Sequence, residues 1–235
     1  MQDKLSSAPD FEISGNTLLK FTGDSNIVSI PEGVEVISEL AFFRKDHIRK
    51  LKIPAGVKEI QKLALYGMSG LSMLNLPSGL ELIGEDAFAM LSVKELTVPD
   101  GVRVIPKGAF GYNHSLKSLT LSEGLSEIGR DAFRACTSVS ELIVPSSVTR
   151  ISAYAFEGCA SLRTLKLGAG LCEIGDFAFF GCAALREVEI PNTVRIIGRN
   201  AFSDTGMLTI VCSDPKSIPE GWNIGKSIKL KKKKG

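Results

Sequence analysis

The chain has 235 residues, of which 44% are hydrophobic and 23% charged, enough for one large domain or two small ones with a substantial buried core. Its formal charge is +2, but five of the 28 basic residues lie in the last seven positions, which leaves 23 basic against 26 acidic residues in the body. This balance excludes a general preference of the body for nucleic acid.

A period of about 23 residues runs through the body of the chain. Eight anchor positions are spaced by 23 residues, except for one step of 22: Pro31, Pro54, Pro77, Pro99, Ser122, Pro145, Gly168 and Pro191. Six residues after each anchor stands an isoleucine: Ile37, Ile60, Ile83, Ile105, Ile128, Ile151, Ile174 and Ile197. Ten and eleven residues after it comes Ala-Phe, with Ala64-Leu65 as the one variant. A fixed period of this length predicts stacked coils, which bury their apolar residues only against one another.

The elements of one coil can be read in order from residue 117. Residues 117–121 alternate apolar and polar side chains, which predicts a short strand with one face buried. At the anchor, Pro-x-Gly fits a type I turn with proline second and glycine fourth. Residues 125–129 then predict a second extended segment. Asp131 is placed to cap one helical turn that ends near Cys136, and the equivalent caps are Asp86 and Asn200.

These residues resemble a known family. The pattern L-x-x-L-x-(I/L)-P-x-G-V-x-x-I-x-x-x-A-F-x-x-C-x-x-L is similar to the BspA-like leucine-rich repeat of bacterial and protist surface proteins, and it covers roughly residues 26 to 210. The resemblance extends to both flanks, because residues 11–22 resemble the hairpin that opens such arrays and residues 209–223 a terminal cap. Physically, a solenoid needs caps because each end exposes a hydrophobic coil, and Trp222 is predicted to cover the last coil.

The predicted fold is therefore an α/β solenoid of the leucine-rich-repeat class, a right-handed superhelix of eight coils with short strands and one helical turn per coil. Residues 1–25 are assigned to the N-terminal flank and capping hairpin, residues 26–210 to the solenoid, and residues 211–235 to the C-terminal cap and basic tail. The tail KLKKKKG is either a disordered solvated terminus or an electrostatic handle for anionic lipid or nucleic acid.

A partner-binding surface is expected on the strands, where outward side chains can vary freely between buried leucines. The outward rows mix charges, with a basic group near the second coil and an acidic edge near the sixth and eighth. A plain solvated sheet would have a similar composition. Phe43, Tyr66 and Phe180 form a second, weaker candidate surface. The strand residues predicted to bind a partner are Arg49, Lys50, Lys52, Met73, Asn75, Glu95, Thr97, Thr120, Glu141, Lys166, Glu187 and Glu189.

The sequence predicts no catalytic, cofactor or metal site. Its two histidines, His47 and His114, lie three coils apart and are interpreted as exposed loop residues. Cys136, Cys159 and Cys182, the cysteine column, recur at one repeat position and are interpreted as packed thiols. A disulfide between adjacent coils and a metal site are the alternatives, and the spacing makes a poor zinc site.

The first functional hypothesis is a non-enzymatic protein-interaction module, adhesin-like by resemblance, and a monomer without a small-molecule substrate. The alternative is an intracellular scaffold or structural spacer with no dedicated ligand. The resemblance implies a cell-surface or secreted protein, whereas the first residues show no signal peptide and imply a cytoplasmic one if Met1 is the true start. The composition does not favour nucleic acid, and membrane contact is expected only through the tail.

Overall fold

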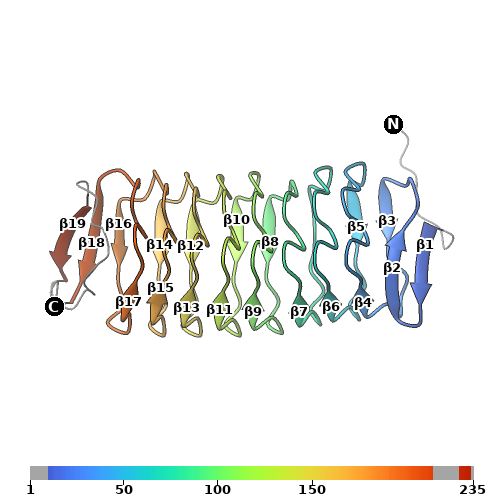
Figure 1. The fold of residues 1–235 in the computed structure, drawn as a ribbon, viewed down its shortest axis with the longest axis horizontal. Coiled ribbons are helices and arrows are strands. Elements are labelled where there is room, and N and C mark those ends of the chain that lie inside the picture. Colours follow the sequence, from blue (N-terminus) through green and yellow to red (C-terminus); the bar gives the residue numbers. More distant parts are fainter. Residues whose placement is uncertain (1–9, 214–227, 234–235) are drawn as a thin grey trace.

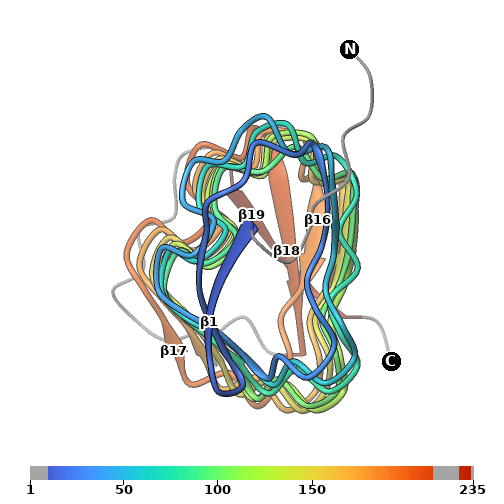
Figure 2. The same cartoon turned by 90° about the vertical axis from the view of Figure 1, so that its right-hand side faces the viewer.

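The chain forms a rod of short, mostly parallel strands, and buried and exposed side chains alternate along most of them (Figure 1). The computed structural model describes residues 10–213 and 228–233 and has about nine stacked turns. Most turns contribute one strand to each of two ladders, and the turn around Met73 contributes only an isolated bridge, to Lys50, to the first. Viewed along the rod, β16 and β18 of the first ladder lie on a different side from β17 of the second (Figure 2).

The first ladder forms the strand face. In its central three-residue strands both outer side chains are exposed and the middle one points inward. The strands pair in parallel as β3–β5, β8–β10, β12–β14 and β16–β18–β19. Their bounds are β3 (Ile27–Ser29), β5 (Lys50–Lys52), β8 (Glu95–Thr97), β10 (Ser118–Thr120), β12 (Glu141–Ile143), β14 (Thr164–Lys166), β16 (Glu187–Glu189), β18 (Leu208–Cys212) and β19 (Ile228–Lys232).

The second ladder carries the isoleucines, and each lies opposite the isoleucine of the next coil except Ile83, which does not pair with Ile105. Its strands are β2 (Thr17–Phe21), β4 (Val36–Ile37), β6 (Glu59–Ile60), β7 (Leu82–Ile83), β9 (Val104–Ile105), β11 (Glu127–Ile128), β13 (Arg150–Ile151), β15 (Glu173–Ile174) and β17 (Ile196–Ile197). Pairing runs from β2 to β7 and from β9 to β17. The interruption coincides with the one 22-residue step, between Pro77 and Pro99.

The N-terminal hairpin is confirmed, and it adds a turn that the count of eight coils missed. Strand β1 (Phe11–Ser14) pairs antiparallel with β2. Leu18 of β2 lies opposite Ile37, and the ring of Phe21 stacks on that of Phe42 at 5.4 Å between centroids. The hairpin arm thus occupies the isoleucine and phenylalanine positions of a first turn, although its sequence lacks the repeat.

The predicted helical turn is wrong, because the described residues contain no α-helix and the Ala-Phe segments are turns. Asp131 has a φ of +55°, Asp86 +54° and Asn200 +53°, in the left-handed region, whereas a helix N-cap has extended geometry. In every coil a second such residue follows four positions later, for example Ala135 (+56°) or Gly158 (+71°). Two left-handed residues per coil reverse the chain before a helix can form.

The core is built from columns of identical side chains. From Phe88 to Phe202, six successive phenylalanine rings stack at 5.1–5.4 Å between centroids and tilt by no more than 9°. Leu65 interrupts the column toward Phe42. The Phe110 amide donates to the Ala132 carbonyl of the next coil at 2.9 Å, and this bond recurs along the column. Burying each ring stabilises the stack by roughly 1.5–3 kcal/mol.

The anchor turn differs from its prediction by one position. The Pro54 carbonyl accepts a hydrogen bond from the Val57 amide, so proline is first in the turn and glycine third. Glycine is favoured there by the close approach of the neighbouring coil. A Cβ on Gly124 would lie 2.5 Å from the carbonyl oxygen of Asp100 in the preceding coil. Ser147 and Thr193 occupy the same position in two other coils.

The basic tail is not the solvated coil that was one interpretation of its sequence. Residues 228–232 form β19, which pairs in parallel with β18, Thr209 opposite Lys229 and Val211 opposite Lys231. The predicted cap thus begins at β18 and includes part of the tail. Trp222 and residues 214–227 lie outside the described residues, so the prediction that Trp222 covers the last coil is not tested.

Candidate functional site

The strand face presents all twelve residues predicted to bind a partner. Every one of them is exposed. A period of two places eleven of them outward while the leucine or valine between them enters the core, and Arg49 immediately precedes β5. Met73 is 68% exposed and Ile143, in the same two rows, 53%. The structure thus brings the twelve residues together on one face as predicted. Whether a partner binds there stays a prediction.

Charge is distributed unevenly along this face. Arg49, Lys50 and Lys52 lie near its N-terminal end, while Glu187 and Glu189 lie near the other. Lys52 approaches Glu32 at 3.9 Å, but both side chains are more than 70% exposed, so this pair contributes little to stability. At the other end, Glu189 accepts a hydrogen bond from Lys233 at 2.5 Å. The basic tail therefore contacts the acidic end.

Shallow grooves open on the strand face where neighbouring strands do not pair, a feature that the sequence did not predict. One groove lies between β10 and β12, lined by Leu119, Leu121 and Ile143 among others. A second lies between β14 and β16 and includes Leu167 and Pro191. A third lies between residues 74–78 and β8. Apolar floors beside exposed polar rows suit the side chains of a protein partner.

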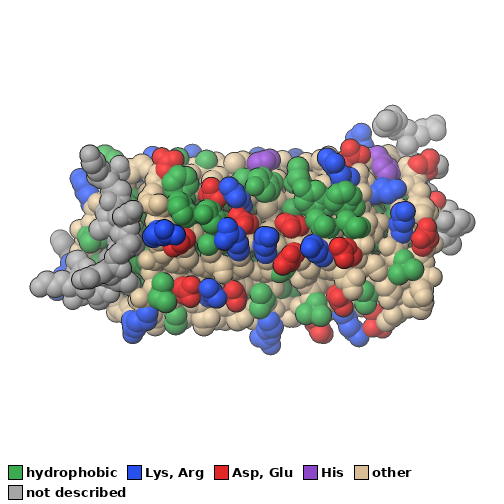
Figure 3. All heavy atoms as spheres, in the orientation of Figure 1, with side chains coloured by type: hydrophobic (Ala, Val, Ile, Leu, Met, Phe, Trp, Pro, Cys, Tyr) green, Lys and Arg blue, Asp and Glu red, His purple; other side chains and the backbone are tan. Residues whose placement is uncertain are grey.

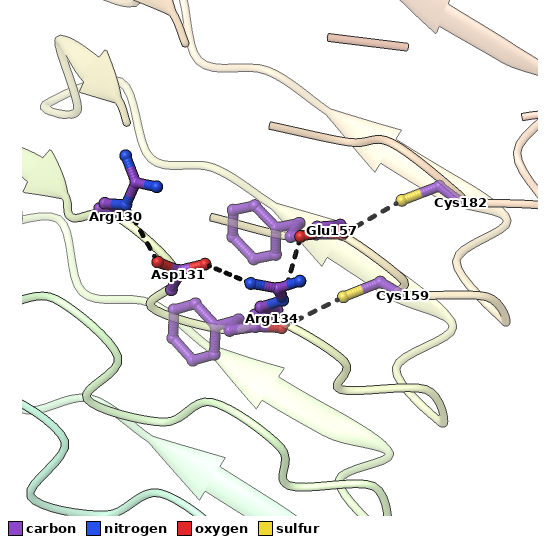
Figure 4. Close-up of polar contacts among 8 residues, drawn as sticks. Arg130, Asp131, Arg134, Glu157, Cys159 and Cys182 are labelled. Carbon is purple, nitrogen blue, oxygen red and sulfur yellow. Dashed lines mark hydrogen bonds and ion pairs between the residues drawn. The ribbon is translucent and has the colours of Figure 1, made fainter. Parts of the chain in front are cut away.

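The side that carries the Ala-Phe turns bears hydrophobic side chains and a row of charged ones (Figure 3). Phe43 is 39% exposed, and Tyr66 and Phe180 are half-buried, so this second candidate surface is accessible. Arg134 bridges Asp131 at 3.3 Å and Glu157 at 3.0 Å, and Arg130 also contacts Asp131 (Figure 4). Neighbouring cations compensate both carboxylates, and the pair of Arg134 with Glu157 connects adjacent coils.

The second ladder also carries exposed apolar residues, which were not among the predicted site residues. Leu82 is 60% exposed, Ile196 54% and Val104 45%. Leu82 and Val104 line a groove beside the interruption of this ladder. Each of these residues immediately precedes the invariant isoleucine, which faces the core. Because successive strand residues face opposite sides, the sequence could have predicted that they are exposed.

The cysteine column is buried, and its thiols are free. Each thiol lies 3.3–3.4 Å from a phenylalanine carbonyl of the preceding coil, as Figure 4 shows for Cys159 and Cys182. Burial raises the pKa of Cys136 and Cys182 to about 12 and that of Cys159 well above 9.0. The packed-thiol interpretation is confirmed, and such protonated thiols are poor nucleophiles.

Two polar residues occupy the same position at either end of the cysteine column. Asn113 is fully buried and donates 2.9 Å hydrogen bonds to the carbonyls of Phe88 and Phe110, while its own carbonyl accepts from the Leu91 amide at 2.8 Å. Thr205 donates to the Phe202 carbonyl at 2.8 Å. Asn113 lies 23 residues before Cys136, and Thr205 lies 23 residues after Cys182. This spacing could have identified both as members of the same buried column. They satisfy buried backbone groups, so their role is structural.

Groups suited to chemistry are dispersed. His47 and His114 are both exposed, as predicted. Partial burial raises the pKa of Asp86 above its ordinary 3.8, and Lys107 lowers it in part. Among residues 10–213 and 228–233, no three His, Cys, Asp or Glu side chains gather in a geometry that would hold a metal ion. In the same residues no helix has the length and apolarity needed to cross a membrane.

Comparison with known proteins decides the family. The model of the BspA type leucine rich repeat region matches residues 15–117 and 103–221, with six copies. The chain belongs to the BspA-type leucine-rich repeat family. A comparison with curated proteins found no match.

Solved structures of bacterial leucine-rich repeat proteins have the same fold. A protein from Bacteroides ovatus is 25% identical with a TM-score of 0.74, over 88% of this chain and 51% of that one. A protein from Eubacterium ventriosum is 17% identical with a TM-score of 0.62, over 88% and 64%. A T. pallidum protein is 24% identical with a TM-score of 0.57, over 86% and 89%. The chain thus spans under two thirds of the first two.

Proposed function

We propose that the chain is a non-enzymatic, monomeric protein-binding module that engages its partner through the strand face, as an adhesin-like component of a cell surface. The observation that carries this proposal is that the strand face presents rows of exposed side chains, while the leucine or valine between them in most strands is buried in the core. Each outward residue can differ from coil to coil without disturbing the core, which allows a specific surface on a rigid support.

The chemistry of the face favours a protein over other ligands. A basic group at one end and an acidic group at the other are separated by strands of mixed charge, whereas nucleic acid would require a long basic stripe. Its grooves are open and shallow, and they alternate with polar rows. Mixed charge around apolar contact points is typical of protein interfaces, in which side chains from both partners interdigitate.

Surface location is supported by the resemblance of the repeat to those of bacterial and protist surface proteins. On intact cells of the source organism, an antibody against the chain should label the exterior, and added protease should remove that label. Labelling only after permeabilisation would contradict the surface location and favour an intracellular scaffold.

Binding can be tested with two matched double variants. Thr97→Arg with Thr120→Arg adds two bulky cations in the middle of the strand face, while Leu82→Arg with Val104→Arg adds the same charge on the second ladder. All four side chains are exposed, so both variants should fold, as circular dichroism would verify.

Each protein would be incubated with immobilised extracellular-matrix proteins and with an epithelial cell extract. The expected result is a partner retained by the wild-type chain and by the second-ladder variant but lost by the strand-face variant. Equal retention by all three proteins would place binding elsewhere. Retention by none would leave the structural spacer as the better interpretation.

A further inference from the structure

Ion pairs between adjacent coils compensate several cations on this rod. Because residues 23 apart stack on one another, a cation can pair with a carboxylate that stands 23 positions away. The pairs that follow this rule are Lys58 with Glu35, Lys62 with Glu85, Arg134 with Glu157, Arg150 with Glu173 and Arg199 with Asp176, at 3.0–3.9 Å.

Four cations at one corner of the rod depart from this rule. Arg44, Lys45, Arg49 and Lys50, here called the basic corner, have only uncharged residues 23 positions before and after them. These neighbours are Phe21, Thr22, Asn26 and Ile27 on one side and Gly67, Met68, Ser72 and Met73 on the other. Within residues 10–213 and 228–233 none of the four forms an ion pair.

The surroundings of the basic corner leave it strongly positive. Lys45 lies 5.5 Å from the centroid of the Phe21 ring, and Arg44, Arg49 and Lys50 are exposed. Asp46 is the one carboxylate within this segment, and His47 follows it. Adjacent Lys52 is also exposed, with Glu32 at 3.9 Å from it. Such a cluster attracts anionic groups, and the attraction is strongest at low ionic strength.

An apolar patch adjoins the basic corner on the turn side. Leu40 is 45% exposed, Phe43 39% and Met90 43%, and Leu63 and Tyr66 are half-buried between them. The rings of Phe43 and Tyr66 stack at 5.4 Å with an interplanar angle of 13°. Figure 3 shows hydrophobic side chains gathered over the coils that carry β4, β6 and β7. These five residues are called the aromatic patch.

We propose that the basic corner and the aromatic patch together bind an acidic polypeptide segment that carries aromatic or aliphatic side chains. The proposal rests on the proposed function in that both concern protein partners and share Arg49 and Lys50 at the end of the strand face, but Arg44 and the aromatic patch extend it onto the turn side. The segment's carboxylates would compensate Arg44, Arg49 and Lys50, which lack partners along the rod. Its apolar side chains would cover Phe43 and Tyr66, since contiguous exposed apolar residues mark interaction sites.

Other anionic partners fit this surface less well. The basic corner spans one coil, about 5 Å along the rod, and nucleic acid requires a longer basic track. A bilayer is broad and would also face the exposed carboxylates of Glu39, Asp46 and Glu85 near the patch. A narrow polypeptide segment can contact the cations and the rings while avoiding those carboxylates.

The test uses the full chain and a random copolymer of glutamate and tyrosine as the probe. Polyglutamate, a single-stranded oligonucleotide and phosphatidylserine vesicles are compared at the same ionic strength. We expect the copolymer to bind more tightly than polyglutamate, because it also covers the aromatic patch, and we expect its affinity to fall as salt increases. Tighter binding of the oligonucleotide or the vesicles would overturn the assignment to a polypeptide, and no binding of the copolymer would overturn the site.

Matched variants locate the binding. Arg44→Gln with Arg49→Gln and Lys50→Gln should weaken copolymer binding about tenfold, because three uncompensated cations are removed. The control, Lys58→Gln with Lys62→Gln and Arg150→Gln, removes the same charge from cations that already have partners and should change affinity little. Equal weakening by both sets would indicate general electrostatic attraction and overturn the proposal.

The aromatic patch has its own comparison. Phe43→Ser with Tyr66→Ser should lower copolymer affinity and leave polyglutamate binding unchanged, whereas Met207→Ser, at a residue 73% exposed elsewhere, should alter neither. Circular dichroism would verify that each variant folds. The strand-face variant Thr97→Arg with Thr120→Arg should retain copolymer binding, so failure of the strand-face proposal and failure of this one can be distinguished.

Discussion

Ile151→Ala is expected to lower the free energy of unfolding by about 3–4 kcal/mol. Ile151 is fully buried on β13 between Ile128 and Ile174 of the neighbouring coils. The substitution removes three carbons, each contributing about 0.8 kcal/mol through burial, and the cavity left between two coils adds the remainder.

Ile143→Ala is the matched control, because it removes the same three carbons from a side chain that is 53% exposed on β12. Its cost should stay below about 1 kcal/mol. Both would be measured by equilibrium urea unfolding followed by circular dichroism. A loss for Ile143→Ala as large as that for Ile151→Ala would refute the assignment of the two faces, on which the strand-face proposal depends.

The cysteine column should stay unreactive toward Ellman's reagent in the folded protein and react once denaturant is added, because its thiols are buried and protonated. Stability should fall as pH rises from about 9 toward about 12, since the unfolded thiols ionise first, and Cys→Ala at all three positions should flatten that pH dependence. Ala135→Gly should stabilise the protein by about 0.5–1 kcal/mol, because Ala135 has a φ of +56°, while Ala160→Gly, without a positive φ, should destabilise it by a similar amount. If thermal melts showed the same sign for both, backbone strain would not be the cause. Deleting residues 145–167, one full period, should leave a folded rod with a slightly lower melting temperature, whereas deleting 12 residues there should abolish the cooperative transition.

Repetition determined which parts of the fold could be predicted. Ile128 and Ile151 could be placed opposite each other because their spacing matches the period, and the inward cysteine column followed in the same way. Leu18 could not be placed, because the hairpin arm occupies the isoleucine column without carrying the motif. Lysine has a low propensity for β-strands, so β19 could not be predicted from its sequence. It pairs with the open edge of β18, which exists only once the rod has folded.

The local conformation of the turns was harder to predict. Asp131 before Ala132-Phe133 is a good helix-capping sequence, yet aspartate also tolerates the left-handed region that it adopts here. Tyr154 and Phe177 occupy the same column at φ values of +61° and +57°, which their side chains do not favour. Stacking and hydrogen bonds to neighbouring coils outweigh that local preference. The conformation of the turn therefore cannot be predicted from the sequence of one coil alone. The grooves of the strand face depend likewise on which strands pair.

The interruption at the 22-residue step has a mechanical consequence. Within residues 10–213, β7 does not pair with β9, and β8 pairs only toward the C-terminal side. The turns still connect these coils, because the Phe88 amide donates to the Ala109 carbonyl at 2.8 Å. Resistance to bending is therefore expected to be lowest at this junction. The two parts of the rod would bend about the hydrogen-bonded turns, which act as the hinge. Under lateral load the rod should deflect there first, as two stiff arms about one joint, and open the groove between residues 74–78 and β8.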